Sequence, residues 1–190
     1  RGKYIRFVDC DDTLPADSMA TLVRKAEDSG SDLVLAAYTE VVGPMHHVRA
    51  LVKREDTVAL DEYLAILNRK ANSFYCGVLW NKLFRTALVQ EQQLRFTSGL
   101  SYGEDMLFVC QYLAGAEKIS YTRSPVYNYI RNAAGITAHQ TVDSLVHPVR
   151  NLRVKWQLYE GLRQLYVQRG QYDRYRRSLW LYMVRVTVNE

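Results

Sequence analysis

Short apolar runs alternate with amphipathic stretches along most of the chain, a pattern typical of proteins built from alternating strands and helices. Residues 4–8 are mostly apolar or aromatic and lead straight into acidic residues, which predicts a buried parallel strand with a loop at its carboxyl end. Residues 16–28 carry apolar side chains on one helical face, and residues 32–39 form a second apolar run. This order predicts a β-α-β unit with parallel pairing.

The middle of the chain is less regular. Gly43-Pro44 indicates a turn of a hairpin. Adjacent histidines on a strand would point to opposite faces, so we expect His46 and His47 in a polar loop rather than at a metal. The next part of the chain predicts a helix at 57–70, a helix from Trp80 to about Gln92, a short strand at 94–96 and a flexible loop at 97–103. A helix from Glu104 and short strands at 118–121 and 125–130 are expected after it. From residue 142 on, the pattern predicts two long helices with a break near Gly170.

The loop after the first strand is the first candidate for chemistry. Asp9, Asp11 and Asp12 lie within four positions, and such close carboxylates repel one another unless a divalent cation or a hydroxyl-bearing ligand lies between them. A solvated acidic turn before the next helix is the alternative. The position at a strand end favours a functional site, because ligands of open α/β sheets bind there.

Composition narrows the class of protein. With 190 residues, 48% of them hydrophobic, the chain can bury one core, alone or with a helical appendage. The sequence contains no apolar run of transmembrane length and no evident signal peptide, so we expect a cytoplasmic location. Cys10, Cys76 and Cys110 are odd in number and lack CxxC spacing, which fits reduced thiols better than disulfides or zinc.

The net charge of +5 is concentrated near the end of the chain. Residues 146–190 hold nine Lys or Arg against three Asp or Glu, together with Trp156, Trp180 and five tyrosines. Basic and aromatic residues interleaved on helices can bind nucleic acid or an anionic membrane. We expect no nucleic acid, because no recognition motif accompanies the charge. Two ordinary helices that pack through their aromatic faces are the simpler alternative.

Four motifs occur in order along the chain: FVDCDD, WNKLFR, GEDMLF and PVYNYIRN. Together they resemble family 2 glycosyltransferases with a GT-A fold, especially bacterial enzymes that build capsules, exopolysaccharides and wall polymers. The resemblance covers residues 2–137. It implies that residues 1–140 form part of a GT-A domain of α/β class and that residues 141–190 form a basic, aromatic helical extension.

The resemblance implies inverting transfer of a sugar from a nucleoside-diphosphate sugar, most often a UDP-sugar, to a saccharide or lipid-linked acceptor. In this family a D-x-D element holds a divalent metal, here Mg²⁺ or Mn²⁺, on the donor diphosphate. Asp9 and Asp11 match that element, and Asp12 is the usual additional acid. Arg131 is expected to meet a phosphate. Because such enzymes often use lipid-linked acceptors, peripheral contact with the inner face of the plasma membrane through residues 146–190 is expected as an addition.

The same resemblance assigns the acceptor side. Asp105 matches the general base of inverting members, which takes the proton of the acceptor hydroxyl, and Glu104 would orient or tune it. Capping of a helix is the simpler role for this acidic pair. Trp80, Asn81 and Lys82 match the segment that lines the acceptor, with Trp80 either stacked on a sugar ring or buried in the core.

Two departures from the family pattern stand out. Gly135 occupies the place of an expected Ser after Arg131, and His139 beyond it is a weak candidate metal ligand. The nucleotide-binding half that precedes the D-x-D strand in the family is missing, about 60–90 residues at roughly 30 per β-α-β unit. We therefore expect a fragment that, alone, binds nucleotide-sugar poorly and has little or no catalytic activity. An unpaired edge strand of its sheet could be covered by formation of a homodimer.

A second family competes for the acidic loop. Residues 9–14 also fit the first motif of haloacid-dehalogenase-like phosphatases, with Asp9 as nucleophile, Asp11 as general acid/base and Thr13 as a phosphate contact. The later motifs of that family are not convincing here, and WNKLFR and PVYNYIRN would stay unexplained. A non-catalytic module that binds a membrane or partner through the basic helices is the third hypothesis.

Overall fold

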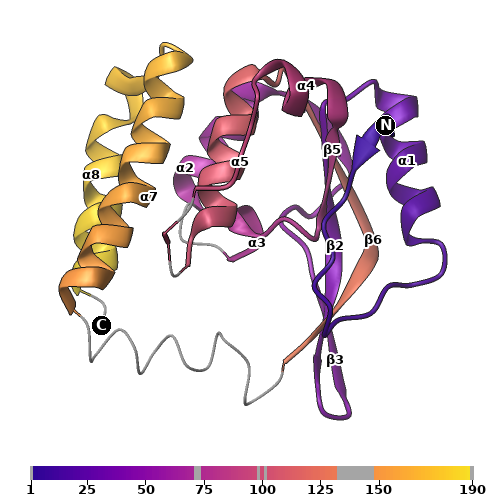
Figure 1. The fold of residues 1–190 in the computed structure, drawn as a ribbon. Coiled ribbons are helices and arrows are strands. Elements are labelled where there is room, and N and C mark those ends of the chain that lie inside the picture. Colours follow the sequence, from indigo (N-terminus) through magenta and orange to yellow (C-terminus); the bar gives the residue numbers. More distant parts are fainter. Residues whose placement is uncertain (1, 71–73, 98, 101, 132–147, 189–190) are drawn as a thin grey trace.

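The computed structural model describes residues 2–70, 74–97, 99–100, 102–131 and 148–188 (Figure 1). Within this part, the strands are β1 (Tyr4–Ile5), β2 (Leu33–Val42), β3 (Met45–Arg49), β4 (Asp56–Ala59), β5 (Lys82–Arg85) and β6 (Lys118–Ile130). The helices are α1 (Ser18–Ser29), α2 (Leu60–Arg69), α3 (Phe74–Gly77), α4 (Thr86–Glu91), α5 (Glu104–Gly115), α7 (Pro148–Gln168) and α8 (Tyr172–Val188). The expected α/β class with a C-terminal helical extension is confirmed.

The strands form one mixed sheet in the order β1-β5-β2-β6-β4, with β3 paired to β2. The long central strands β2 and β6 are parallel, whereas β5 is antiparallel to both of its neighbours, β1 and β2. β1 and β2 therefore run in the same direction but are not adjacent. The predicted parallel pairing of the first two strands is wrong, because β5 lies between them.

The first strand is shorter and less buried than predicted. Only Tyr4 and Ile5 pair with β5, and they lie at one edge of the sheet. Val8, which was expected in the same buried strand, is 49% exposed. An edge strand has a neighbour on one side only, so its side chains are covered incompletely.

Residues 80–92 do not form the single helix that was predicted. Lys82, Leu83 and Phe84 are buried in β5, which pairs on both sides, and only Thr86–Glu91 is helical. Pairing on two sides outweighs the local helical periodicity.

Other boundaries also differ from the prediction. The helix expected at 57–70 begins at Leu60, since residues 56–59 pair with β6 as an edge strand. His46 and His47 lie in the exposed strand β3 rather than in a loop, although the hairpin itself is confirmed. Residues 94–96 form no strand, and the two strands expected at 118–130 are one strand whose register shifts opposite Ala36 and Ala37.

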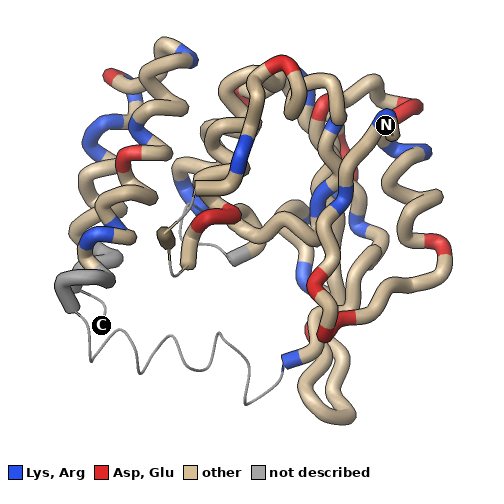
Figure 2. The backbone as a smooth tube through the Cα atoms, in the orientation of Figure 1, with Lys and Arg blue, Asp and Glu red and all other residues tan. Residues whose placement is uncertain are grey.

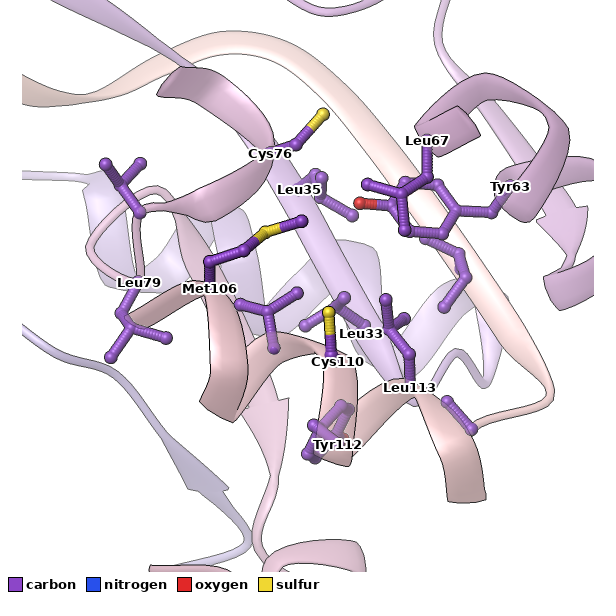
Figure 3. Packing of buried hydrophobic residues seen from close by; sticks show 14 of the residues in the cluster. Leu33, Leu35, Tyr63, Leu67, Cys76, Leu79, Met106, Cys110, Tyr112 and Leu113 are labelled. Carbon is purple, nitrogen blue, oxygen red and sulfur yellow. The ribbon is translucent and has the colours of Figure 1, made fainter. Parts of the chain in front are cut away.

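The main core lies between the sheet and the helices on one of its faces. Figure 3 shows Leu33 and Leu35 of β2 packed with Tyr63 of α2 and with Met106 and Cys110 of α5. Figure 1 shows α1 on the opposite face of the sheet. This arrangement places the N-terminal end of α5, where the GEDMLF motif lies, over the sheet.

The last two helices form a hairpin beside α2 and α5 (Figure 1). The hydroxyl of Tyr166 donates to the Leu64 carbonyl at 2.8 Å, and the Ser178 hydroxyl lies 2.8 Å from Asn68 Oδ1, so both helices of the hairpin are tied to α2. The predicted break near Gly170 is confirmed. Across the described residues, no helix combines the length and apolarity needed to cross a membrane.

Candidate catalytic site

The acidic loop that follows β1 is hydrogen-bonded to the C-terminal end of β6. The backbone N–H of Asp9 donates to the Tyr127 hydroxyl oxygen at 3.0 Å, and the carboxylate of Asp12 accepts from the backbone N–H of Ile130 at 2.7 Å. Asp12 is therefore turned back toward the sheet. Asp9 and Asp11 are the more exposed carboxylates of the loop.

Two further contacts hold the ends of this loop. Arg6 donates to the Ser18 hydroxyl at 2.9 Å and to the Val126 carbonyl at 2.6 Å, which ties the strand before the loop to α1 and β6. Beyond the acids, Thr13 and Asn128 form an isolated antiparallel bridge, in which the Asn128 N–H donates to the Thr13 carbonyl at 2.9 Å. The loop is thus fixed on both sides of its carboxylates.

The carboxylates of the loop destabilise one another when charged. Partial burial raises the pKa of Asp9, and the charges of Asp12 and Asp11 raise it further. Burial also raises the pKa of Asp12, opposed by its hydrogen bonds to Ile130 and Tyr127. A bound cation would relieve this repulsion.

The donor set fits a hard divalent cation, because Mg²⁺ and Mn²⁺ prefer carboxylate oxygens. In the part of the chain that the structure describes, however, no three His, Cys, Asp or Glu side chains are grouped closely enough to hold a metal ion. Asp9 and Asp11 alone would give only part of the ligand set of such a cation. Oxygen atoms from another molecule, such as a diphosphate, would have to complete it.

Asp105 lies in the first turn of α5, near enough to the acidic loop for the charge of Asp9 to act on it. The pKa of Asp105 is raised to about 6, mainly by burial and also by the charges of Glu104 and Asp9, against the lowering effects of Lys82 and of a hydrogen bond with the Leu79 backbone. A carboxylate with such a pKa is charged at neutral pH and basic enough to accept a proton. The fold thus brings together the D-x-D loop and the acidic pair of GEDMLF.

Trp80 is a core residue in this structure. It is 3% exposed, and its indole stacks on the Tyr127 ring with centroids 4.4 Å apart and planes 12° apart, while Tyr38 meets it edge-on. Of the two alternatives for Trp80, the buried core position is the one that this structure shows. Its contact with Tyr127 instead supports the residue whose hydroxyl holds Asp9.

Asn81 and Lys82 are also buried, with no exposed surface. The Lys82 ammonium donates to the carbonyls of Tyr75 and Val78 and to Asn81 Oδ1, the first at 3.1 Å and the last at 2.9 Å. Burial lowers the pKa of Lys82 to about 7, against the effects of Cys76 and Asp105. Neither side chain reaches the surface in this structure, and the contact of Asn81 and Lys82 with an acceptor stays a prediction.

These two residues support the site from inside instead. Lys82 crosslinks the turn that contains Leu79, and the backbone of Leu79 hydrogen-bonds Asp105. The WNK segment thereby fixes the position of the candidate base.

Arg131 lies at the end of β6, next to the residue that binds Asp12. Its backbone N–H donates to the Val41 carbonyl at 2.9 Å, and its guanidinium lies 3.4 Å from the Glu40 carboxylate, which also pairs with Arg49. The Arg131 side chain is 61% exposed, so an anionic ligand could reach it. Gly135 and His139 lie outside the described residues.

Comparison with known proteins adds a second line of argument. No protein-family model matches the chain. EpsH of Bacillus subtilis (strain 168), ascribed to the glycosyltransferases, is 28% identical over 134 residues, which cover 68% of this chain and 38% of EpsH. TarP of Staphylococcus aureus (strain N315), a poly(ribitol-phosphate) β-N-acetylglucosaminyltransferase, is 22% identical over 143 residues, covering 75% of this chain and 42% of TarP.

A solved structure of S. aureus TarS residues 1–349 in complex with UDP-GlcNAc superposes with a TM-score of 0.64 at 22% identity, covering 88% of this chain and 43% of that chain. The chain is a relative of bacterial glycosyltransferases. Its fold is that of the part of TarS that it covers, and together with the curated relatives this confirms the resemblance to glycosyltransferases. This glycosyltransferase relative spans less than half the length of EpsH, TarP and TarS.

Sequence reasoning missed the residues that support the site. Tyr127 lies within PVYNYIRN. Because side chains of a strand alternate between its two faces, this alternation was the signal that could have placed Tyr127 on the face that contacts Trp80. Arg6 and Tyr75 gave no such signal, because their roles depend on contacts between distant segments.

Proposed function

We propose that this chain carries the metal, diphosphate and base elements of an inverting glycosyltransferase of family 2. The enzyme would move a sugar from a UDP-sugar to a saccharide or lipid-linked acceptor during synthesis of a cell-surface polysaccharide. The observation that carries the proposal is the convergence of the D-x-D loop and Asp105 at one end of the sheet, where the charge of Asp9 reaches Asp105. The names of TarP and of the TarS complex with UDP-GlcNAc support the donor class.

The donor side consists of exposed groups on a fixed loop. Asp9 and Asp11 would hold Mg²⁺ or Mn²⁺, which when bound neutralises negative charge on the diphosphate. The Asp12 carboxylate accepts a hydrogen bond from the Ile130 backbone N–H, and this bond fixes the path of the loop backbone. The Arg131 guanidinium would pair with a phosphate oxygen as a planar, multiply donating cation.

Asp105 would act as the general base. In the reaction the acceptor hydroxyl oxygen attacks the anomeric carbon, the bond from that carbon to the diphosphate oxygen breaks, and the electron pair leaves with the diphosphate. The hydroxyl proton passes to the Asp105 carboxylate. Glu104 raises the proton affinity of Asp105 through its charge, while Lys82 and the Leu79 backbone hold the carboxylate in place.

The test is Asp105→Asn in the full-length protein that contains this chain, with the exposed Asp28→Asn as matched control. We expect a 10²- to 10⁴-fold lower kcat for Asp105→Asn with a donor dissociation constant within about twofold of wild type. Wild-type activity should fall as the pH drops through about 6, because Asp105 then takes up a proton and cannot accept another. Normal turnover by Asp105→Asn would refute the assignment.

Peripheral membrane contact through α8 belongs to the same proposal. Trp180 and Leu181 are 64% and 53% exposed, and Arg174, Arg176 and Arg177 precede them on the same helix. Such a surface suits an anionic bilayer, into which aromatic rings insert while arginines meet headgroups. Salt-sensitive pelleting with phosphatidylserine vesicles, and none with phosphatidylcholine alone, is the expected result. Absence of pelleting at low salt would remove this part of the proposal.

A further inference from the structure

A hollow of about 360 Å³ lies between α5 and α7, away from the acidic loop. Its walls carry an unusual set of amides: Gln111 from α5 and Gln157, Gln164 and Gln168 from α7. The indole of Trp156 stands at its rim and is 57% exposed. We call this hollow the α5–α7 groove.

The floor of the groove is apolar and closely packed. It is formed by Leu107 and Cys110 of α5 and by Leu165 of α7. Gly161 lets the two helices meet there, since a Cβ at that position would lie 2.5 Å from Leu107 Cδ2. The groove therefore has a firm floor and polar walls.

The charges in the groove exclude anionic ligands. Glu160 is the sole charged residue among those that line it within the described chain. Its two carboxylate oxygens accept from Arg163 Nε and Nη2, both at 2.7 Å, so its charge is already paired. No lysine or arginine of the described residues lines the groove to bind phosphate.

The amides, in contrast, are available to a ligand. Gln164 donates to Glu160 at 3.1 Å, but the side chains of Gln111, Gln157 and Gln168 make no hydrogen bond to any described residue. Each amide offers one oxygen acceptor and two N–H donors, the combination that pairs with neighbouring hydroxyl groups. An exposed indole offers a flat apolar face beside them.

We propose that the α5–α7 groove binds a neutral saccharide chain, with Trp156 stacked on the C–H face of one sugar ring and the glutamine amides bonded to hydroxyls. The volume lies at the lower end of the range for small-ligand sites, about 300–1,000 Å³. Amides, one neutralised acid and an exposed indole match a hydroxyl-rich, uncharged ligand. They match neither a nucleotide nor an acidic peptide.

The position on α5 gives this site a role, which rests on the proposed function. Leu107, Cys110 and Gln111 follow Asp105 by two, five and six residues on the same helix, so at about 1.5 Å and 100° per residue the groove lies roughly 3–9 Å along the axis from the candidate base but on the opposite side of α5. It would hold a part of a polymeric acceptor that lies around the helix from the unit undergoing reaction.

The experiment is a titration of the protein with four neutral tetrasaccharides: chitotetraose, maltotetraose, cellotetraose and laminaritetraose. It is followed by tryptophan emission in a Trp180→Phe background, in which Trp156 is the exposed indole that remains, since Trp80 is buried. EDTA is present and nucleotide is absent. We expect at least one tetrasaccharide to bind with a millimolar or lower dissociation constant.

Variants separate the groove from the rest of the surface. Trp156→Ala should weaken binding, measured by calorimetry, at least tenfold, and Gln157→Ala and Gln168→Ala should each weaken it about three- to tenfold. Trp180→Ala, which removes another exposed indole outside the groove, should leave the affinity unchanged. Circular dichroism checks that each variant is folded, which we expect because these side chains lie on the surface.

Three outcomes overturn the inference: none of the four tetrasaccharides binds, Trp156→Ala binds as well as wild type, or Trp180→Ala loses binding equally. Because the titration contains no metal and no donor, it does not depend on Asp9, Asp11 or Asp105. Failure of donor binding in the full-length protein would refute the proposed function and leave a positive groove result standing. Failure of the titration would refute the groove alone.

Discussion

Tyr127 joins the core to the acidic loop. Its ring stacks on Trp80, and its hydroxyl oxygen accepts the N–H of Asp9 at 3.0 Å. The same hydroxyl bonds the Asp12 carboxylate, which favours the charged form of Asp12. A single phenol therefore restrains the acidic loop at Asp9 and at Asp12, on both sides of Asp11.

Tyr127→Phe should keep the stacking and lose these hydrogen bonds. In the full-length protein we expect donor affinity to fall about three- to tenfold, in line with about 1 kcal/mol for one hydrogen bond. Tyr121→Phe is the matched control, because the buried Tyr121 hydroxyl has no hydrogen-bond partner among the described residues. Equal donor affinities for the two variants, measured by calorimetry, would show that the phenol does not organise the loop.

Lys82 leads to a prediction about pH and stability. Its pKa in the folded chain is about 7, lowered mainly by burial from the ordinary value of 10.5. Between these values the unfolded chain binds a proton that the folded chain lacks, so the free energy of unfolding should rise with pH.

Lys82→Met should flatten that rise, as measured by urea denaturation between pH 7 and 9.5. The exposed Lys118→Met is the control and should keep the wild-type slope. An unchanged slope in Lys82→Met would mean that Lys82 stays charged in the folded protein, and that its bonds to the Tyr75 and Val78 carbonyls are those of an ammonium ion throughout.

At the scale of single elements, the start of α5 depends on Gly103. This residue caps the helix with φ of +85°, and a Cβ there would come within 2.9 Å of Leu158 Cδ2 on α7. Both the left-handed backbone and the contact with α7 therefore favour glycine immediately before Glu104 and Asp105.

Gly103→Ala should lower the free energy of unfolding by roughly 1–2 kcal/mol and lower kcat as well, since the first turn of α5 holds the candidate base. Gly77→Ala is the control, because a Cβ at Gly77 would make an ordinary contact of 3.6 Å with Met106. Thermal unfolding and single-turnover assays measure the two effects. Wild-type kcat in Gly103→Ala would argue that the position of this turn is not critical.

The elements also show what the sequence could predict. The helix α1, which has one clear apolar face, was predicted with small boundary errors, and so was the break between α7 and α8 near Gly170, because helical periodicity is a local property. β5 was predicted as helix, since Leu83 and Phe84 are apolar neighbours in either structure and only their pairing with β1 and β2 decides between the two.

The same limit applies to the candidate site. The motifs supplied Asp9, Asp11 and Asp105, whose chemistry is visible in residue type and spacing. The motif did not decide whether Trp80, Asn81 and Lys82 are buried, because exposure in a turn before a strand depends on what packs over it. The supporting contacts of Tyr127 link residues more than 100 positions apart, and no local pattern reports them.

At the scale of the whole molecule, the acidic residues of the candidate site and the basic residues of the last two helices lie in different parts of the structure. The acidic groups of the candidate site lie at the loop after β1 and at the start of α5, whereas basic residues are spread along α7 and α8 (Figure 2). A chain organised in this way can bring a cation and a diphosphate to one end of the sheet, and present a basic, aromatic helix to a surface elsewhere.

The account depends most directly on donor binding at the D-x-D loop. The decisive measurement is calorimetric titration of UDP into the full-length protein that contains this chain, with Mn²⁺ and again with EDTA, for wild type and Asp11→Asn. We predict that wild type binds UDP with Mn²⁺, and that binding is lost or weakened at least tenfold in EDTA and in Asp11→Asn. Equal binding by wild type and Asp11→Asn, or binding that is indifferent to the metal, would contradict the proposed donor site.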